Sequence, residues 1–190
     1  MVPFVCEIPA GTRAKMEVNL QSAHNPIVQD KHRNEDLRYW SKAPMFNYGM
    51  IPQTYEDPKK KCPIANMFGD ADPIDVVDIS TIRSMDVGSI APAKILGSFC
   101  LIDEGEADWK IIVSTNPSDN LNNEVLQNIF HFFETYKTDA QNYIHNNRQL
   151  FTPTETRDVL HLACTNYNNL IENLQNENGQ KTGLWFPQQA

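Results

Sequence analysis

Short runs of apolar and β-branched residues, bounded by turn residues, dominate the first two thirds of the chain. Such runs are typical of β-strands. An acidic segment that contains glycine separates the last two runs at 103–108, and it predicts the loop of a β-hairpin. The predicted strands lie at 4–8, 15–19, 75–80, 94–102 and 109–114.

The last third of the chain changes to the period of an α-helix. A second helix is predicted to begin at Thr152-Pro153-Thr154-Glu155, because this order of residues makes a capping box with proline in the first turn. Its apolar stripe consists of Val159, Ala163, Leu170 and Leu174. The apolar face of the first helix consists of Leu121, Val125, Ile129, Phe132, Phe133 and Tyr136.

Strands followed by helices predict an α+β fold, in which a small barrel or curled sheet is flanked by two helices. The length of 190 residues suits one domain with a sizeable core. We therefore expect residues 1–190 to form a single domain with a loose polar tail near 176–190. Leu184, Trp185 and Phe186 interrupt this tail with apolar side chains; packing on their own domain is favoured over contact with a partner.

Charge and targeting signals narrow the classes of function. The chain has 24 acidic and 16 basic residues and a net charge of -8, so it has no general attraction for nucleic acid or an anionic membrane. No signal peptide and no run of the ~18 apolar residues that span a bilayer are evident. The scattered cysteines predict reduced thiols in a cytoplasmic protein; the alternative is two disulfides in a secreted one. They are Cys6, Cys62, Cys100 and Cys164.

The most informative chemistry lies in the acidic run Asp70, Asp72 and Asp75. Pro73 forces a turn that lets alternate carboxylates converge, and converging carboxylates repel each other unless cations lie between them. Hard oxygen ligands of this kind suit Mg²⁺, Mn²⁺ or Ca²⁺. Asp78 should face the other side of its strand. The alternative is a solvated acidic turn.

Two further charged patterns support an anion site that includes metal ions. Asp108 and Lys110 share one face of a predicted strand, and Lys15 and Glu17 repeat this alternation. Combined in one sheet, these patterns would surround an anionic substrate with metals and cations. An EF-hand is excluded because Asp75 stands where the loop requires glycine. The second acidic group consists of Asp103, Glu104, Glu106 and Asp108.

The segment Asp70-Ala-Asp72-Pro-Ile-Asp75-Val resembles the signature of family I soluble inorganic pyrophosphatases. The resemblance covers residues 4 to 140 strongly, with motifs closer to the eukaryotic branch and a length closer to the bacterial one. Further matching blocks occur in order: Glu7-Ile8-Pro9, Lys15-Met16-Glu17, Asn25 to Asp30, Leu37-Arg38-Tyr39, Asn47-Tyr48-Gly49, Pro52 to Asp57, Asp103 to Lys110, and His131 to Lys137.

The resemblance implies an OB-like five-stranded β-barrel with flanking α-helices and hydrolysis of pyrophosphate to two orthophosphates. It implies several Mg²⁺ ions per site, with Mn²⁺ as a possible substitute, and a homo-oligomer, with a dimer favoured over a hexamer. Asp72 would be the general base, and Glu7 would support the site. The implied metal ligands are Asp70, Asp75, Asp103, Asp108 and Glu17, and the implied substrate-binding residues are Lys15, Arg38, Tyr48, Lys110, Tyr136 and Lys137.

One departure from the family pattern is Pro44, which stands where the family usually has a tyrosine four residues before Tyr48. A catalytically weakened family member is therefore one alternative. Another is a metal-dependent phosphohydrolase that acts on nucleotides or polyphosphate. A third is a binding module for nucleic acid, since OB-like barrels often have that role, but the acidity of the chain disfavours it.

Overall fold

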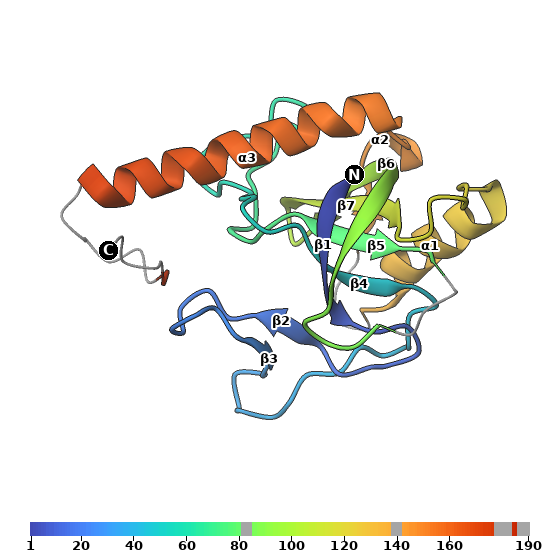
Figure 1. Ribbon diagram of the computed structural model, residues 1–190, viewed down its shortest axis with the longest axis horizontal. Coiled ribbons are helices and arrows are strands. Elements are labelled where there is room, and N and C mark those ends of the chain that lie inside the picture. The colour runs from blue at the N-terminus through green and yellow to red at the C-terminus, as the bar shows by residue number, and fades with distance from the viewer. Residues whose placement is uncertain (81–84, 138–141, 177–183, 186–190) are drawn as a thin grey trace.

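The structure is a computed structural model that describes residues 1–80, 85–137, 142–176 and 184–185. A mixed sheet forms its centre, with α1 and α3 beside it (Figure 1). The strands are β1 (Val2–Ile8), β2 (Met16–Val18), β3 (Ile27–Gln29), β4 (Asn47–Met50), β5 (Asp75–Asp78), β6 (Ile90–Asp103), β7 (Glu106–Ser114) and β8 (Tyr143–Ile144). The helices are α1 (Asn123–Thr135), α2 (His145–Arg148) and α3 (Pro153–Asn176).

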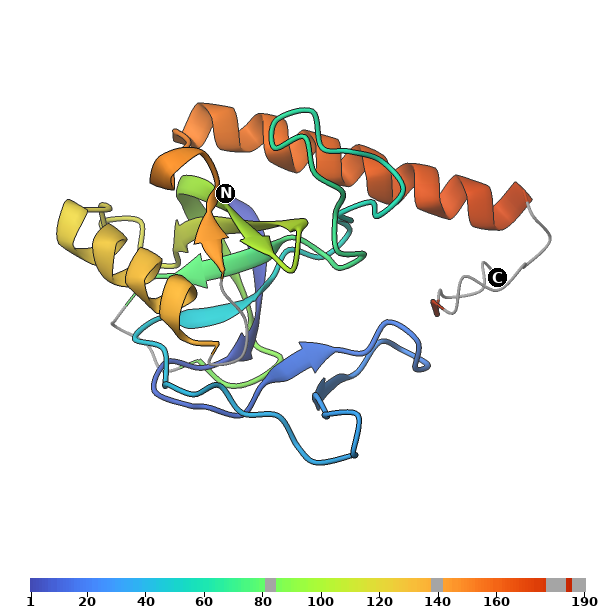
Figure 2. The same cartoon turned by 180° about the vertical axis from the view of Figure 1, so that it is seen from behind.

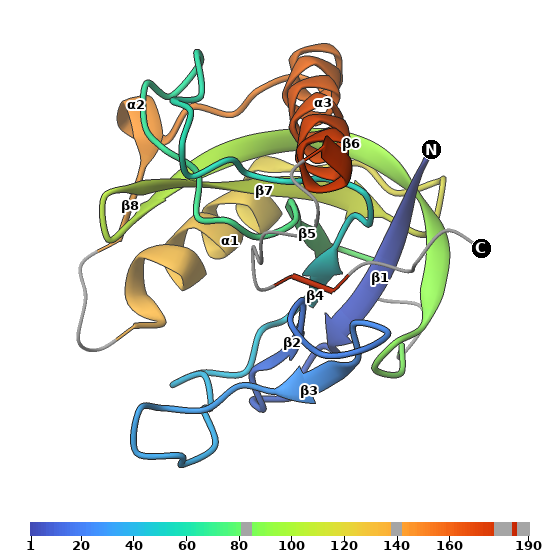
Figure 3. The same cartoon turned by 90° about the vertical axis from the view of Figure 1, so that its left-hand side faces the viewer.

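The sheet closes into a ring in the order β1, β4, β5, β7 and β6. Closure depends on the length of β6, which pairs with β1 near Ile90 and with β7 from Lys94 onward. Figure 3 shows β6 curving over the molecule between these two partners. β5 and β7 run parallel, whereas the other pairs in the ring are antiparallel. The prediction of an α+β fold with an OB-like five-stranded barrel is confirmed.

Both faces of β5 and β7 are covered, which explains their continuous apolar runs. Val76 and Ile111 belong to an apolar cluster that includes Val159 of α3. Val77 and Ile112 point the other way, into a cluster to which α1 contributes Ile129, Phe130, Phe132 and Phe133. Figure 2 shows the two helices on different sides of the sheet. Polar residues on these strands therefore need partners inside the fold.

The predicted helices form where their capping signals occur. Asn122 caps α1, because its side chain accepts a hydrogen bond from the backbone N–H of Val125 at 2.9 Å. Thr152 and Glu155 form the predicted capping box of α3, since the Thr152 N–H donates to Glu155 at 2.7 Å. Val159 and Ala163 are buried as expected. Leu170 is half-buried, and the side chain of Leu174 lies outside the described part.

The predicted loop at 103–108 is wrong in length. β6 extends to Asp103 and β7 begins at Glu106, so the turn consists of Glu104 and Gly105 alone. Both turn residues have positive φ, 52° and 91°, which suits the right-handed twist of a tight hairpin. The shorter turn places Asp108 within β7, where strand pairing fixes its direction.

Several elements carry no clear sequence signal, namely β3, β4, β8 and α2. β4 contains Asn47 and Gly49 and lacks alternating apolar residues, yet it pairs on both sides, with β1 and β5. Asn146 and Asn147 in α2 adopt left-handed backbone angles, which asparagine tolerates better than most residues. Tertiary pairing therefore decides these segments.

The C-terminal tail is described only at Leu184 and Trp185, so the predicted looseness of 176–190 falls mainly on residues 177–183 and 186–190, outside the described part. The backbone N–H of Trp185 donates to the carbonyl of Leu20 at 2.6 Å. Its ring lies 4.8 Å from that of His24. Trp185 thus packs on the turn between β2 and β3 of its own chain.

Candidate active site

A cavity of about 590 Å³ lies against the barrel and is lined by residues of β1, β2, β4, β5, β6 and β7 and of the adjoining loops. The cavity gathers all residues that sequence reasoning selected for the site, although their roles remain predictions. They are Glu7, Lys15, Glu17, Arg38, Tyr48, Asp70, Asp72, Asp75, Asp103, Asp108, Lys110, Tyr136 and Lys137. Lining residues that the sequence analysis did not name include His32, Trp40, Ser41 and Met50.

Lys110 is the centre of the buried part of this site, with 2% of its surface exposed. Its Nζ lies 2.5 Å from both carboxylate oxygens of Asp108 and also contacts Asp75. Tyr48 donates its hydroxyl to Asp75, and Lys110 lies 3.0 Å from the same hydroxyl. Burial alone would lower the pKa of Lys110, but Asp108 and Asp75 raise it well above its usual value. Lys110 therefore stays charged.

Strand register produces this group of side chains. Asp108 and Lys110 are two residues apart on β7 and share a face, as predicted. The parallel pairing of β5 and β7 places Asp75 opposite Lys110, and Tyr48 lies on β4, the other neighbour of β5. Asp78 faces the opposite side, where it is fully buried and accepts hydrogen bonds from Asn47 and Ser80. Asp78 thus has a structural role.

A second charged group joins the β2–β3 hairpin to the cavity. Lys15 Nζ lies 2.6 Å from Glu17 and 2.7 Å from Asp30, and Arg38 binds the same oxygen of Asp30 at 2.5 Å. Burial opposes the charge of Lys15, but Glu17 and Asp30 raise its pKa overall. Asp30, which was not assigned a role from the sequence, therefore holds two of the predicted phosphate-binding side chains at the cavity wall.

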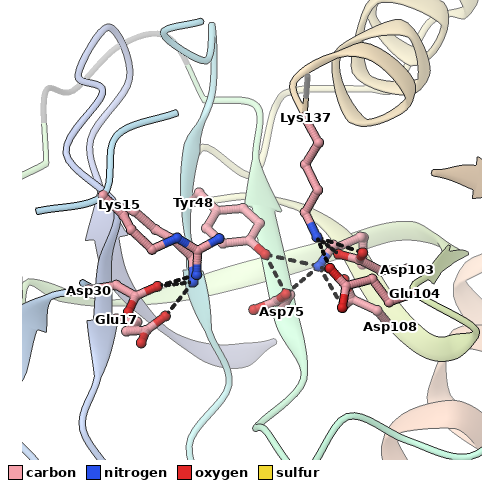
Figure 4. Close-up of polar contacts among 11 residues, drawn as sticks. Lys15, Glu17, Asp30, Tyr48, Asp75, Asp103, Glu104, Asp108 and Lys137 are labelled. Carbon is pink, nitrogen blue, oxygen red and sulfur yellow. Dashed lines mark hydrogen bonds and ion pairs between the residues drawn. The ribbon is translucent and has the colours of Figure 1, made fainter. Parts of the chain in front are cut away.

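A third group lies at the end of β6. Lys137, which follows α1, places Nζ 2.6 Å from both carboxylate oxygens of Asp103. Glu104 of the hairpin turn is 3.9 Å from the same Nζ. Figure 4 shows Lys137 extending from the end of α1 toward this turn. The tight hairpin and the helix end thus bring an acid and a base together.

The acidic loop bends at Ala71 and Asp72, just before Pro73, where the sequence predicts the turn. Ala71 has φ of 72°, and the backbone N–H of Asp72 donates to Asp70 Oδ1 at 3.0 Å. Burial and then Asp108 raise the pKa of Asp70 to about 9. Burial, followed by the negative charge of Asp75, raises the pKa of Asp72 to about 6. The positive charges of Lys15 and Lys110 partly offset this increase. Asp72 is thus mostly ionised near pH 7.

Glu56 is a further acidic residue of the site that sequence reasoning did not assign. One carboxylate oxygen from each of Glu56, Asp70 and Asp108 lies within 4.8 Å of the others. Glu56 Oε2 is buried and has no hydrogen-bond partner among the described residues. Its only sequence signal is its place in the block Pro52 to Asp57.

These donors fit a hard divalent cation. Carboxylate oxygens converge from β5, from β7 and from the loop of Asp70, and a buried oxygen of Glu56 lacks a partner within the described chain. Oxygen-rich sites of this kind suit Mg²⁺ and Mn²⁺ better than soft metals. Within the described residues, Glu56, Asp70 and Asp108 bring ligand oxygens close enough together to share such an ion.

Residues 4–168 match the family model described as "Inorganic pyrophosphatase". The chain belongs to the inorganic pyrophosphatase family. A probable inorganic pyrophosphatase of Plasmodium falciparum is 33% identical over 204 residues, which cover 94% of this chain and 53% of that protein. The inorganic pyrophosphatase of Drosophila melanogaster is 44% identical over 114 residues, or 57% of this chain and 33% of that protein. The chain thus spans about half, or less, of the length of these curated relatives.

Solved pyrophosphatase structures share the fold. The type I inorganic pyrophosphatase of Toxoplasma gondii has a TM-score of 0.82 at 32% identity, covering 88% of this chain and 79% of that one. The type I enzyme of P. falciparum has a TM-score of 0.84 at 28% identity, covering 97% and 72%. No helix among the described residues is long and apolar enough to cross a membrane.

Pro44, the departure from the pyrophosphatase pattern, is not among the residues that line the cavity. Its side chain is buried, and its carbonyl accepts a hydrogen bond from the N–H of Gly11 at 2.8 Å. Trp40 lines the cavity, and its ring lies 5.0 Å from that of Tyr48 and 5.5 Å from that of Tyr136. Pro44 therefore belongs to the packing of this loop, and Trp40 supports the two tyrosines.

Proposed function

We propose that this chain hydrolyses inorganic pyrophosphate to two orthophosphates, with Mg²⁺ as the metal and Mn²⁺ as a substitute. The gathering of the predicted acids and bases in one cavity supports this function most directly. Pyrophosphate carries several negative charges, so its site must contain matching positive charge. Lys15, Arg38 and Lys137 line the cavity, while Lys110 supplies a buried charge beside Tyr48.

Asp72 is the proposed general base. It lines the cavity, and its pKa of about 6 leaves it ionised near pH 7, where it can accept a proton from water. The attacking water forms a new P–O bond while the bridging P–O bond breaks, and the proton passes to Asp72. Asp70, Asp75, Asp103, Asp108 and Glu17 are the proposed metal ligands. Bound cations neutralise substrate charge and lower the pKa of the attacking water.

The basic residues hold the two phosphates during this step. Lys15 and Arg38 are aligned by Asp30 on one side of the cavity, while Lys137 lies beside Asp103 on the other. Arg38 can bind two phosphate oxygens at once. The hydroxyls of Tyr48 and Tyr136 are kept neutral, because burial raises the pKa of each. They therefore donate hydrogen bonds without adding charge.

Phosphate release from pyrophosphate with Mg²⁺ is the direct test. Release from pyrophosphate but not from ATP is the expected result. Release from ATP or polyphosphate at a similar rate would favour another metal-dependent phosphohydrolase. Salt-sensitive binding of single-stranded nucleic acid without phosphate release would favour a binding module.

The same proposal includes a cytoplasmic, single-domain homo-oligomer of residues 1–190, with a dimer favoured over a hexamer. Named relatives include a chloroplastic form in Arabidopsis thaliana and a mitochondrial form in Mus musculus, so location differs within the family. Light scattering of the purified chain measures the assembly state, and microscopy of a tagged chain measures its location.

A further inference from the structure

The backbone of Glu56 is fixed against the acidic loop. Its N–H donates to the carbonyl of Asp72 at 2.9 Å, and its carbonyl accepts the N–H of Ala71 at 2.9 Å. Gly69 allows this close approach, because a Cβ there would lie 2.4 Å from the Glu56 carbonyl carbon. The position of Glu56 is thus coupled to that of the loop that carries Asp70 and Asp72.

Only one of the two carboxylate oxygens of Glu56 has a hydrogen-bond partner among the described residues. The backbone N–H of Trp109, next to Asp108, donates to Oε1 at 3.1 Å. Glu56 is 5% exposed, and its Oε2 has no hydrogen-bond partner in the described part of the chain. A buried carboxylate oxygen without a partner is costly, so it points to a group that binds there.

The surroundings of Oε2 select the kind of group. Glu56, Asp70 and Asp108 bring a ligand oxygen each to within 4.8 Å of the others. Within the described chain, Lys110 pairs with Asp108, whereas neither Glu56 nor Asp70 has an ion pair. The acids therefore outnumber the bases at this point, which favours a cation.

The spacing of the oxygens suits a small divalent ion. Ligands placed octahedrally at 2.0–2.1 Å from Mg²⁺ lie about 3 to 4 Å apart. The three oxygens lie up to 4.8 Å apart, so small movements of the side chains would bring them to the spacing that Mg²⁺ requires. Asp70 and Asp108 line the cavity, whereas Glu56 lines a separate, smaller pocket together with Trp109 and residues of α3.

We infer that Glu56 is a further ligand of the metal centre, whose Oε2 binds the cation held by Asp70 and Asp108. This inference rests on the metal centre of the proposed function, but not on the identity of the substrate. The competing explanation is that Glu56 is protonated and donates a hydrogen bond to a neighbouring carboxylate.

The substitution Glu56→Gln separates these explanations. Glutamine keeps an acceptor for the Trp109 N–H and can donate a hydrogen bond as a protonated glutamate does, but it lacks the charge. Free Mn²⁺ is measured by electron paramagnetic resonance during titration of the purified chain without substrate. We expect at least ~10-fold weaker Mn²⁺ binding in Glu56→Gln. An unchanged Mn²⁺ dissociation constant would overturn the inference.

Asp57→Asn is the matched control, because it makes the same change of charge in the adjacent residue. Asp57 accepts a hydrogen bond from the N–H of Lys59, which asparagine can also accept. Its Mn²⁺ dissociation constant should equal that of the wild type. A tenfold loss in both variants would mean that net charge, and not the position of Glu56, sets the affinity, and would overturn the inference.

Thermal unfolding provides a second measurement. In EDTA, Glu56→Gln should unfold at a higher temperature than the wild type, because a repelling buried acid is gone. The stabilisation by Mn²⁺ should shrink in the same variant. An equal loss of stability with and without Mn²⁺ would show a packing role only and overturn the inference. If Glu56→Gln does not fold, Glu56→Asp, which withdraws the carboxylate by one methylene, should show the same weaker binding.

The outcomes also separate this inference from the proposed function. If the wild type releases no phosphate from pyrophosphate but Glu56→Gln binds Mn²⁺ more weakly, the proposed function fails and the inference stands. If the wild type hydrolyses pyrophosphate and Glu56→Gln binds Mn²⁺ normally, only the inference fails.

Discussion

Asp72 differs from the other aspartates of its loop in what surrounds it. Asp75 is bound by Lys110 and Tyr48, and Asp70 lies in the buried cluster with Glu56. Asp72 lines the cavity, and its carboxylate makes no ion pair within the described chain. A general base needs an ionised, accessible oxygen, so the surroundings of Asp72 suit proton transfer.

Asp72→Asn should lower turnover of pyrophosphate by about 10² to 10⁴-fold, because general base catalysis contributes effects of this size. The fold should persist, since asparagine keeps the backbone bonds of the loop. Phosphate-release kinetics and Mn²⁺ titration check both statements, with Mn²⁺ binding expected near the wild-type value. Near-normal turnover in the purified variant would exclude Asp72 as the base.

Asp75→Ala should raise the Mg²⁺ concentration needed for half-maximal activity. Asp75 contacts Lys110 and Tyr48 and is one of the proposed metal ligands. Titration of phosphate release with Mg²⁺ measures the shift. Asp86→Ala, which removes an exposed aspartate outside the cavity, is the control and should not change the titration. Identical titrations for Asp75→Ala and the wild type would contradict a ligand role.

Among the strands, β4 depends on a single glycine. A Cβ on Gly49 would lie 1.9 Å from the carbonyl oxygen of Val5 on the paired strand β1. Gly49→Ala should therefore reduce the free energy of unfolding by about 3 kcal/mol or more, because the strands must move apart. Chemical denaturation measures this loss.

Gly88→Ala provides a comparison for that substitution. Gly88 has a φ of 82° but open space around it, so alanine there meets backbone strain without a clash. Its cost should be about 1–2 kcal/mol. If both substitutions lowered the free energy of unfolding equally, β1 and β4 would be able to move apart at little cost, which would contradict the prediction for Gly49→Ala.

Sequence patterns predict the elements whose own residues decide their structure. β1, β6 and β7 have long apolar runs, and α1 and α3 have helical periods with caps. β4 was missed because its polar and glycine residues become a strand only between two partners. β8 has two residues and forms against β6. Short segments of this kind depend on contacts that are distant in the chain.

In the site, too, sequence patterns predict the contacts within one strand but not the contacts between distant segments. Alternation along a strand correctly places Asp108 beside Lys110 and Lys15 beside Glu17. Asp30 and Glu56 escaped assignment because their importance comes from partners on other elements. Asp30 lies just after β3 and reaches Lys15 across the hairpin, while Glu56 is a loop residue buried by Gly69 and Trp109. A linear pattern contains neither contact.

For the chain as a whole, buried acids make the stability of the metal-free protein depend on pH. Burial, followed by neighbouring acids, raises the pKa of Glu7 to about 8 and that of Asp70 to about 9. An acid whose pKa is higher in the folded state binds more protons there than when unfolded. Its contribution is present below the unfolded pKa of about 4 and is lost as pH rises toward 8 or 9.

The melting temperature in EDTA should therefore fall as pH rises from 6 to 9. Mg²⁺ should reduce this fall, because a cation stabilises the ionised acids. Differential scanning fluorimetry across this range measures both slopes. Glu7→Gln, which removes one titrating group outside the proposed metal ligands, should flatten the EDTA slope in part. A melting temperature that rises with pH in EDTA would contradict the raised pKa values.

Lys110 gives the molecule an internal counterion. This allows the chain to fold before it binds a metal, and it bears on the affinity for the proposed substrate. Because the ammonium already neutralises Asp75 and Asp108, a newly made chain can complete its fold before it meets any metal. If these carboxylates held a divalent ion, as proposed, Lys110 would lose two partners and its charge would be free for a phosphate oxygen. The proposed ion and substrate would then each increase affinity for the other by the same factor.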